Sequence, residues 1–199
     1  MPPMGRNVGV SLGSGSVASD DRDLVSRARA GDQAAFTALF EQFHVPILNY
    51  LTRMVSDREV AEDLAQDTFI KAYNALPATR DDLLVKPWLY RIATNTAISY
   101  HRRRKIIQWL PFIGGDEDLH PSGESVEGAV LDRYDVERAL AKLPKHYAAV
   151  LLLRHYQGLS LAETAKALDI TENAAKLRLF RARKAFAGVY GTPPAEVPS

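Results

Sequence analysis

The chain has 199 residues and a mass of 22.0 kDa, which allows one domain or two small ones. Hydrophobic residues make up 46% of it and charged residues 25%, the range of ordinary soluble proteins, which argues against a wholly disordered or fibrous chain. The absence of cysteine excludes disulfides, thiolate metal sites and cysteine nucleophiles. Because no two of the five histidines share a helix face, we expect no metal site and no cofactor.

The charges are segregated along the chain, although the net charge is only +1. Residues 1–105 hold 14 basic and 12 acidic residues, residues 106–137 hold one and eight, and residues 138–190 hold ten and three. A basic C-terminal block, joined by an acidic stretch to a mixed N-terminal block, predicts two domains and a linker. It also points to a polyanion as one partner.

Residues 1–20 contain four glycines among serines and no apolar run long enough for a signal sequence or a membrane span. We therefore expect a disordered tail and no membrane insertion. Helical spacing begins at Asp20, and one apolar face follows it: Phe36, Leu39, Phe40, Phe43, Ile47 and Leu51. Pro46 lies inside this stretch and predicts a kink or a short break, because proline cannot donate to the helix ladder.

A second helix is expected to start at the Ser56-Asp57 cap and to end at Leu76-Pro77. Residues 77–86 have the composition of a loop. Pro87 suits the first turn of a third helix, which would run to a basic end at residues 101–105.

Residues 106–133 are expected to form an acidic linker that is rich in glycine and proline. Helical periodicity resumes near Tyr134, Pro144 is expected to begin a fresh helix, and Gly158 to follow its end. No segment alternates with a period of two over the length of a strand. The predicted fold is all-α, with helical domains at 21–105 and 134–190 and a coil at 191–199.

Residues 160–184 carry the pattern of a helix-turn-helix. Ser160 and Glu163 form a capping box at the start of a short helix, and a three-residue turn at 169–171 precedes a second helix. In that helix Ala175, Leu179, Ala182 and Phe186 face the core, which leaves the cations on the exposed side. A solvated surface is the usual explanation of such charges. The coincidence of cap, turn and basic second helix instead favours DNA binding in the major groove.

The N-terminal half presents two contrasting surfaces. Five acids between residues 57 and 67 repel phosphate and suit a basic protein partner, although such runs are most often simply solvated. The helix from Pro87 interleaves aromatic side chains, amides and cations, a mixture suited to single-stranded DNA. Trp88 and Leu89 of that helix are expected in the core.

Three stretches together resemble the extracytoplasmic-function (ECF, group IV) sigma factors of the sigma-70 family. They are DREVAEDLAQDTFIKAY at 57–73, PWLYRIATN at 87–95, and the segment from Leu143-Pro144 through Gly158-Leu159-Ser160 to Arg183. They occur in the order and at the spacing of the family, over roughly residues 21–190. The resemblance implies a bacterial transcription initiation factor that binds core RNA polymerase and directs it to specific promoters, not an enzyme.

The resemblance also implies roles for individual residues. The domain at 21–105 would be sigma region 2 and the domain at 134–190 region 4. The coiled coil of the largest polymerase subunit would bind Asp63, Gln66, Asp67 and Phe69. The −10 element would be held by Arg91, Asn95, Thr96, Tyr100, Arg102, Arg103, Arg104 and Lys105. The −35 element would be read by Asn173, Ala174, Lys176, Leu177, Arg178, Arg181 and Lys184.

The sequence departs from the family pattern at a few positions. Thr79 stands where many relatives have an aromatic residue, and Ala174 and Leu177 replace the frequent Thr and Ser, which points to a different −35 readout. Because no regulatory domain follows residue 190, the family pattern favours control by an anti-sigma factor. That partner would act in the cytoplasm or hold the protein at the membrane. The polymerase flap is a further implied partner.

Two other functions are open to the residues alone. A stand-alone helix-turn-helix regulator explains residues 134–190 equally well but leaves the acidic and aromatic surfaces of the N-terminal half without a role. An enzyme is disfavoured because no nucleophile-elbow or phosphate-loop glycine pattern positions the available Ser, His and Asp residues.

Overall fold

The structure is a computed structural model that describes residues 14–108 and 129–190. Within those residues every regular element is a helix, so the all-α prediction is confirmed. The N-terminal half contains α1 (Ser14–Arg29), α2 (Gln33–Val55), α3 (Arg58–Ala75), the short 3₁₀ element η1 (Leu76–Ala78) and α4 (Val85–Gln108). The helix α1 begins at Ser14, so residues 14–20, which were assigned to the disordered tail, are helical. Serine is favoured at helix starts, which explains why α1 begins before the residue at which the sequence analysis expected it to begin.

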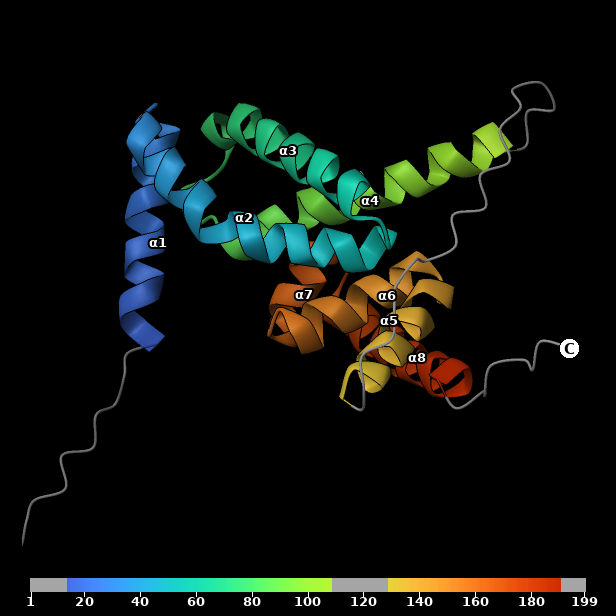
Figure 1. Ribbon diagram of the computed structural model, residues 1–199. Coiled ribbons are helices and arrows are strands. Elements are labelled where there is room, and N and C mark those ends of the chain that lie inside the picture. The colour runs from blue at the N-terminus through green and yellow to red at the C-terminus, as the bar shows by residue number, and fades with distance from the viewer. Residues whose placement is uncertain (1–13, 109–128, 191–199) are drawn as a thin grey trace, which may run out of the picture.

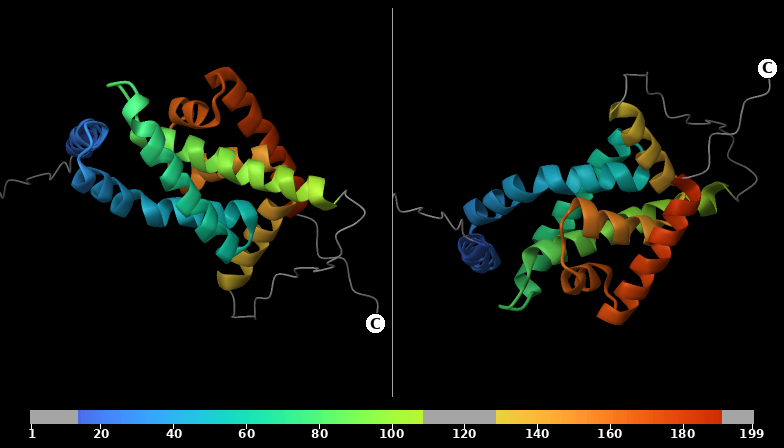
Figure 2. Two further views of the ribbon diagram at one scale, coloured as in Figure 1. Left: turned by 90° about the horizontal axis from the view of Figure 1, so that it is seen from above. Right: turned by 90° about the horizontal axis from the view of Figure 1, so that it is seen from below.

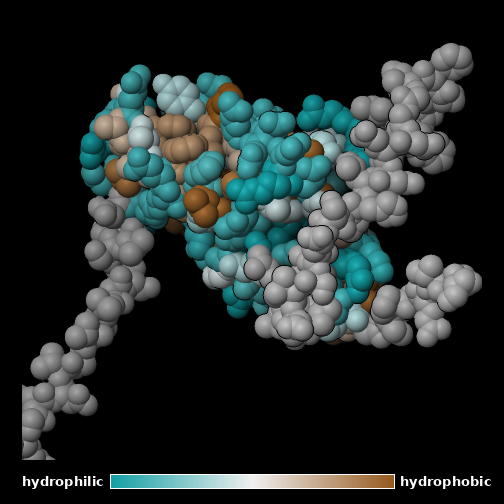
Figure 3. All heavy atoms as spheres, viewed as in Figure 1, coloured by the Kyte–Doolittle hydropathy of each residue, from teal (hydrophilic) through white to brown (hydrophobic). Residues whose placement is uncertain are grey.

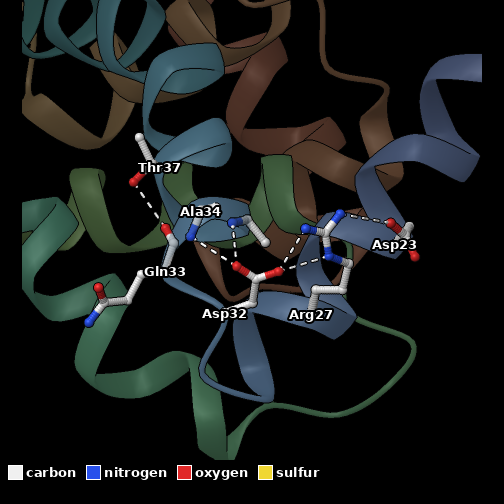
Figure 4. A network of polar contacts seen from close by, with 7 residues as sticks. Asp23, Arg27, Asp32, Gln33, Ala34 and Thr37 are labelled. Carbon is white, nitrogen blue, oxygen red and sulfur yellow. Dashed lines mark hydrogen bonds and ion pairs between the residues drawn. The ribbon is translucent and has the colours of Figure 1, made fainter.

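A polar corner fixes the junction between α1 and α2 (Figure 4). The side chain of Asp32 caps α2 by accepting hydrogen bonds from the backbone nitrogens of Ala34 and Ala35, at 2.9 and 3.1 Å. The same carboxylate accepts from Nε and Nη2 of Arg27, at 2.9 and 2.7 Å. The Arg27 hydrogen bond is the main reason that the pKa of Asp32 is lowered. One side chain therefore both starts α2 and holds the end of α1.

Of the kink or short break expected at Pro46, the break does not occur, because α2 continues through this residue as one helix. Proline removes one hydrogen bond from the helix ladder. Burial on the C-terminal side offsets this loss, since Ile47, Leu48 and Leu51 are 0–7% exposed. The helix ends at Ser56 in the left-handed conformation, with φ 60°, and Asp57 caps α3 by accepting from the nitrogen of Val60. The cap predicted at this position is confirmed.

A buried hydrogen-bond chain joins α2 to α4. Thr94 donates to the carbonyl of Tyr90, 2.7 Å away, so the Tyr50 hydroxyl donates to Thr94 Oγ1, also at 2.7 Å. The rings of Tyr50 and Tyr90 meet edge to face at 5.3 Å, and burial raises the pKa of both phenols. Because these polar groups satisfy one another, they fix the position of α4 along α2 without exposing the core.

The C-terminal half contains α5 (Ala129–Lys142), α6 (Lys145–Leu151), the π-helical turn η2 (Leu152–Tyr156), α7 (Leu161–Leu168) and α8 (Glu172–Tyr190). Pro144 precedes α6 and Gly158 has a φ of 66°, as predicted. Helical structure begins at Ala129 rather than near Tyr134, because residues 129–133 contain good helix formers and no glycine. The predicted linker is therefore helical at 106–108 and 129–133, and its remainder, 109–128, lies outside the described residues.

The two halves pack against each other rather than standing apart (Figures 1 and 2). The helix α7 lies along α4, while α5 and α6 contact α2. One continuous hydrophobic core runs through both halves, from Val25 in α1 to Ala182 in α8. Trp88 and Leu89, at 8% and 3% exposed, are part of this core, as predicted.

The half-buried ring of His101 makes the fold sensitive to acid. Burial is the main cause of its lowered pKa, and its Nε2 atom lies 3.0 Å from the carbonyl of Met54. The unfolded chain then binds the proton more readily, so this stability is fully present above the unfolded pKa of about 6.5 and is lost as the pH falls from there through the lower pKa of the folded state. We expect the unfolding free energy to fall between pH 7.5 and 5.5, and His101→Gln to reduce this slope. Urea denaturation at both pH values measures it, and equal slopes for parent and variant would contradict the assignment.

Candidate protein and nucleic-acid interfaces

The acidic surface of α3 consists of Asp63, Gln66 and Asp67, all of them exposed. Two salt bridges on α3 partly neutralise the negative charge near this surface. One joins Arg58 to Glu62 at 2.9 Å, and the other joins Lys71 to Asp67 at 3.6 Å. Exposed pairs of this kind contribute little to stability. The carboxylates therefore remain available to a basic partner.

An aromatic groove lies beside the acidic surface, between α2 and α3, with a volume of about 430 Å³. Its walls are Phe36, Phe40, His44, Glu62, Gln66, Phe69, Ile70 and Tyr73. The Phe40 and Phe69 rings meet edge to face at 4.8 Å, as do those of Phe36 and Tyr73 at 4.9 Å. Figure 3 shows hydrophobic residues gathered over α2 and α3 on this face.

Phe69 is only 5% exposed, so it lines the groove rather than projecting from α3. Sequence reasoning placed Phe40 on one apolar helix face and gave Tyr73 no binding role, and the two residues are 37% and 51% exposed. The sequence does contain a signal for the groove. Phe69 and Tyr73 lie one turn apart on α3 and form a second apolar stripe beside the main one. An apolar groove beside carboxylates suits an amphipathic helix with a basic edge.

The helix α4 carries the residues expected to meet the −10 element. Asn95 is exposed at mid-helix, Arg91 is half-buried, and residues 102–105 are exposed at the basic end. Tyr100 is half-buried, and its hydroxyl accepts a hydrogen bond from Nη1 of Arg104 at 3.4 Å. These side chains place an amide edge, an aromatic ring and several cations along one helix, which is the chemistry that binds unpaired DNA.

Thr96 differs from its neighbours, because it is 2% exposed. Its hydroxyl accepts a hydrogen bond from Nζ of Lys71, 3.2 Å away on α3. The same Lys71 forms the salt bridge to Asp67. In this structure Thr96 therefore ties α4 to α3 instead of facing solvent.

The helix-turn-helix is formed by α7 and α8. The capping box is confirmed: Ser160 Oγ accepts from the nitrogen of Glu163 at 3.2 Å, and the Glu163 carboxylate accepts from the nitrogen of Ser160 at 2.8 Å. Asp169 takes the left-handed conformation in the turn, with φ 53°. Thr171 then caps α8 by accepting from the nitrogen of Ala174 at 3.2 Å. Local hydrogen bonds thus set the residues at which the two helices begin.

The second helix separates its faces as predicted. Ala175, Leu179 and Ala182 are buried and Phe186 is partly buried, whereas the −35 candidates other than Arg178 are exposed: Asn173, Ala174, Lys176, Leu177, Arg181 and Lys184. Arg178 is half-buried. The pKa of His146 is lowered first by burial of the His146 ring and second by the positive charge of Arg178. Phe180, at 67% exposed, was missed because sequence reasoning weighed only the cations and the small residues of this helix.

Comparisons with known proteins identify both halves. Residues 39–106 match the family described as Sigma-70 region 2, and residues 133–186 match Sigma-70, region 4. The chain is 36% identical over 176 residues to the RNA polymerase sigma-H factor of Pseudomonas aeruginosa, covering 83% of this chain and 91% of that protein. It is 34% identical over 194 residues to the ECF RNA polymerase sigma factor SigM of Mycobacterium tuberculosis, covering 96% and 94%. The chain is an ECF sigma factor of the sigma-70 family.

Solved structures agree with this assignment. The sigma factor resembles CnrH, solved in complex with the cytosolic domain of CnrY, with a TM-score of 0.66 and 25% identity over 85% of this chain and 96% of that one. The fold is shared with the sigma factor RpoE of Bartonella quintana, solved with the anti-sigma factor NepR. That match has a TM-score of 0.61 and 22% identity over 77% and 95% of the two chains.

The family assignment decides between the interpretations left open by the sequence. A stand-alone helix-turn-helix regulator accounts for the region 4 match but not for region 2, which covers the acidic and aromatic surfaces. Sigma factors are transcription initiation factors, the function that the sequence resemblance implies. Among residues 14–108 and 129–190, no helix is long and apolar enough to cross a membrane, and no cluster of metal-ligating side chains occurs.

Proposed function

We propose that this sigma factor binds core RNA polymerase, captures the melted −10 element and reads the −35 element of its promoters. The observation that carries the proposal is the division of chemistry between surfaces of one chain. The acidic surface and aromatic groove of α2 and α3 suit a basic protein, while the cationic faces of α4 and α8 suit nucleic acid.

The polymerase contact is assigned to Asp63, Gln66 and Asp67, with Phe69 lining the groove beside them. A coiled coil from the largest subunit would lay apolar side chains in the groove and basic side chains against the carboxylates. The exposure of Phe40 and Tyr73 supports this arrangement, because such aromatic residues supply most of the energy of protein interfaces. The polymerase flap is proposed as a second contact, on region 4.

The −10 contact is assigned to α4. Asn95 would hold the edge of an unpaired base, with Arg91 and Tyr100 nearby, and residues 102–105 would attract the phosphates. Thr96 is proposed to act through the position of α4, since its hydroxyl is bound to Lys71. Because Thr96 is buried, we propose that it holds α4 in position rather than binding the −10 element itself.

The −35 contact is assigned to α8, where Arg181 is a better candidate for base readout than the half-buried Arg178. Leu177 is 49% exposed and supplies an apolar surface for a thymine methyl group, as expected from its departure from the family pattern. Asn173, Ala174 and Lys176 flank it at the start of the helix, and Lys184 lies toward its end.

Arg181→Ala is expected to reduce the discrimination between a selected −35 duplex and a scrambled one by about 1 to 3 kcal/mol. Lys184→Ala is instead expected to weaken binding to both duplexes equally and to lower the salt slope by about 0.9, as loss of a phosphate contact does. Fluorescence anisotropy titrations at several salt concentrations measure both effects. If Arg181→Ala still discriminates fully between the selected and the scrambled duplex, the bases are read by other residues, with Asn173, Ala174 and Leu177 as the candidates.

A regulatory partner and a cellular location complete the proposal. CnrH was solved in complex with the cytosolic domain of another protein, and we propose that an anti-sigma factor binds this chain in a comparable way. The protein would act in the cytoplasm or be held at the membrane by that partner.

The most direct test of the function is purification of the chain together with core RNA polymerase. We expect a stoichiometric complex that starts transcription from promoters which the core enzyme alone does not use. A chain that passes through gel filtration separately from the core enzyme would contradict the proposal.

A further inference from the structure

The helix α1 has no role in the proposed contacts, yet two arginines of its last turn hold two different parts of region 2. Nη2 of Arg27 forms an ion pair with Oδ2 of Asp32, the cap of α2, at 2.7 Å. Nη1 of Arg29 instead donates to Oδ1 of Asp81, 52 residues further along the chain. We call residues 79–84, which connect η1 to α4, the entry loop. The entry loop is therefore tied to a helix that is distant in the sequence.

The two partners of this ion pair differ in exposure. The Arg29 side chain is 22% exposed, whereas that of Asp81 is 96% exposed. Nε of Arg29 is buried and has no hydrogen-bond partner among residues 14–108 and 129–190, so packing around α1 restricts the guanidinium. The hydrogen bond from Arg29, and then its charge, lowers the pKa of Asp81, and this carboxylate is ionised at neutral pH. A charged side chain on an exposed loop is thus drawn toward a cation that the fold keeps in place.

The ends of the entry loop are held by other contacts. The hydroxyl of Thr79 donates to the carbonyl of Leu76 at 2.6 Å, and the backbone nitrogen of Thr79 donates to the same oxygen at 3.0 Å. At the other end, Leu83 packs against the core. Arg80 and Asp82 form an ion pair at 3.5 Å within the loop, but their side chains are 90% and 80% exposed, so this pair contributes little. The contact from α1 therefore fixes the middle of the entry loop.

The entry loop lies at the opposite end of α4 from the basic end at residues 102–105 (Figure 2). Asn95 is between them, about 15 Å from the start of the helix at a rise of about 1.5 Å per residue. A DNA strand whose phosphates meet the basic end and whose unpaired base meets Asn95 reaches the entry loop when it continues along α4. The loop carries two carboxylates and one arginine. Its net negative charge repels phosphate over about 8 Å at physiological salt, so the position of Asp81 matters for that strand.

We propose that Arg29 is a positioning residue for the −10 contact, because its pairing with Asp81 draws this carboxylate toward α1 and away from the path of the melted strand. This inference rests on the proposed capture of the −10 element by α4. With Arg29 removed, Asp81 faces the strand with an uncompensated charge. Repulsion of phosphate then opposes the melted state, while the acidic surface and the aromatic groove, which contain neither residue, are unaffected.

Arg29→Gln removes the cation and keeps a polar side chain. We expect it to lower the ratio of melted to unmelted promoter about five-fold, the size of one charge–charge contact at about 4 Å in water. Arg27→Gln is the matched control, since it makes the same substitution in the same turn of α1 and breaks the pair with Asp32 instead. The control should unfold at a lower temperature but melt the promoter like the parent. Arg29→Lys keeps the charge, so it should retain melting.

A second substitution separates the effect of charge from that of stability. Arg29→Gln together with Asp81→Asn removes both charges and is expected to restore melting to the parent level. If Arg29 only stabilised α1, or touched the DNA itself, the double variant would stay as defective as Arg29→Gln. Asp81→Asn alone should melt the promoter at least as well as the parent. Higher salt should narrow the gap between Arg29→Gln and the parent, because it screens the repulsion.

Permanganate footprinting of the holoenzyme on a selected promoter measures melting, titration with core RNA polymerase verifies equal core binding, and circular dichroism follows thermal unfolding. Arg29→Met, which fills similar space without a charge, replaces Arg29→Gln if that variant does not fold.

The outcomes separate this inference from the proposed function. Melting at the parent level by the folded Arg29→Gln, an equal loss in Arg27→Gln, or a double variant that is not restored would overturn the role of Arg29 alone. Equal melting by Asn95→Ala and the parent would instead contradict base capture by Asn95 of α4, and the role of Arg29 would fall with it.

Discussion

Reversing both carboxylates of the acidic surface, Asp63→Lys with Asp67→Lys, is expected to lower the affinity for core RNA polymerase by at least about ten-fold. Like charges placed against each other across an interface cost several kcal/mol, and both side chains are exposed on α3. The fold should be unaffected, since within residues 14–108 and 129–190 the only ion pair lost is the weak one from Asp67 to Lys71. Titration of labelled sigma factor with core enzyme measures the affinity.

The matched control is Asp23→Lys with Asp82→Lys, which changes the net charge equally at exposed positions of α1 and of the loop before α4. This pair should retain core binding. Equal losses in the two double variants would show that total charge, and not the acidic surface, governs the association. Higher salt should weaken the parent complex more than the Asp63, Asp67 variant.

The second large effect is expected at Asn95. A base taken out of the DNA stack costs a few kcal/mol, which contacts to its edge must offset. Asn95→Ala removes an exposed amide at the centre of α4, so open-complex formation should fall by about ten-fold or more while initial duplex binding is retained.

Permanganate footprinting on a promoter selected with the reconstituted holoenzyme measures melting, and gel-shift titration measures the initial complex. Asn74→Ala places the same substitution at an exposed position of α3 and should leave both unchanged. Equal melting by the Asn95 variant and the parent would place base capture on other residues, with Arg91 and Tyr100 the nearest candidates.

The sequence predicted the helices well wherever a boundary depends on local chemistry. The caps at Asp57, Ser160 and Thr171 each satisfy backbone nitrogens within three residues, so nothing distant decides them. The boundaries at Ser14 and Ala129 were placed too late, because composition was taken as a sign of coil where serine and short apolar residues are compatible with a helix. That the helix continues through Pro46 without a break could not be predicted, because burial of its neighbours depends on the whole fold.

The candidate sites were predictable to the extent that they depend on helical periodicity. The exposed face of α8 follows from the spacing of its buried alanines and Leu179. The burial of Thr96 does not, because it requires Lys71 of a neighbouring helix. The packing of region 2 against region 4 could not be predicted from the sequence either. No spacing or motif around Gln157 indicates that its side chain accepts a hydrogen bond from Tyr90.

The separation of faces on α8 has a consequence for how such proteins diversify. The residues that hold the helix in place, Ala175, Leu179 and Ala182, are distinct from the exposed Lys176, Leu177 and Arg181. Substitutions at exposed positions usually change the unfolding free energy by no more than about 0.5 kcal/mol. A duplicated copy of this gene can therefore acquire a new promoter preference through a few codon changes on one helix face while its scaffold stays intact.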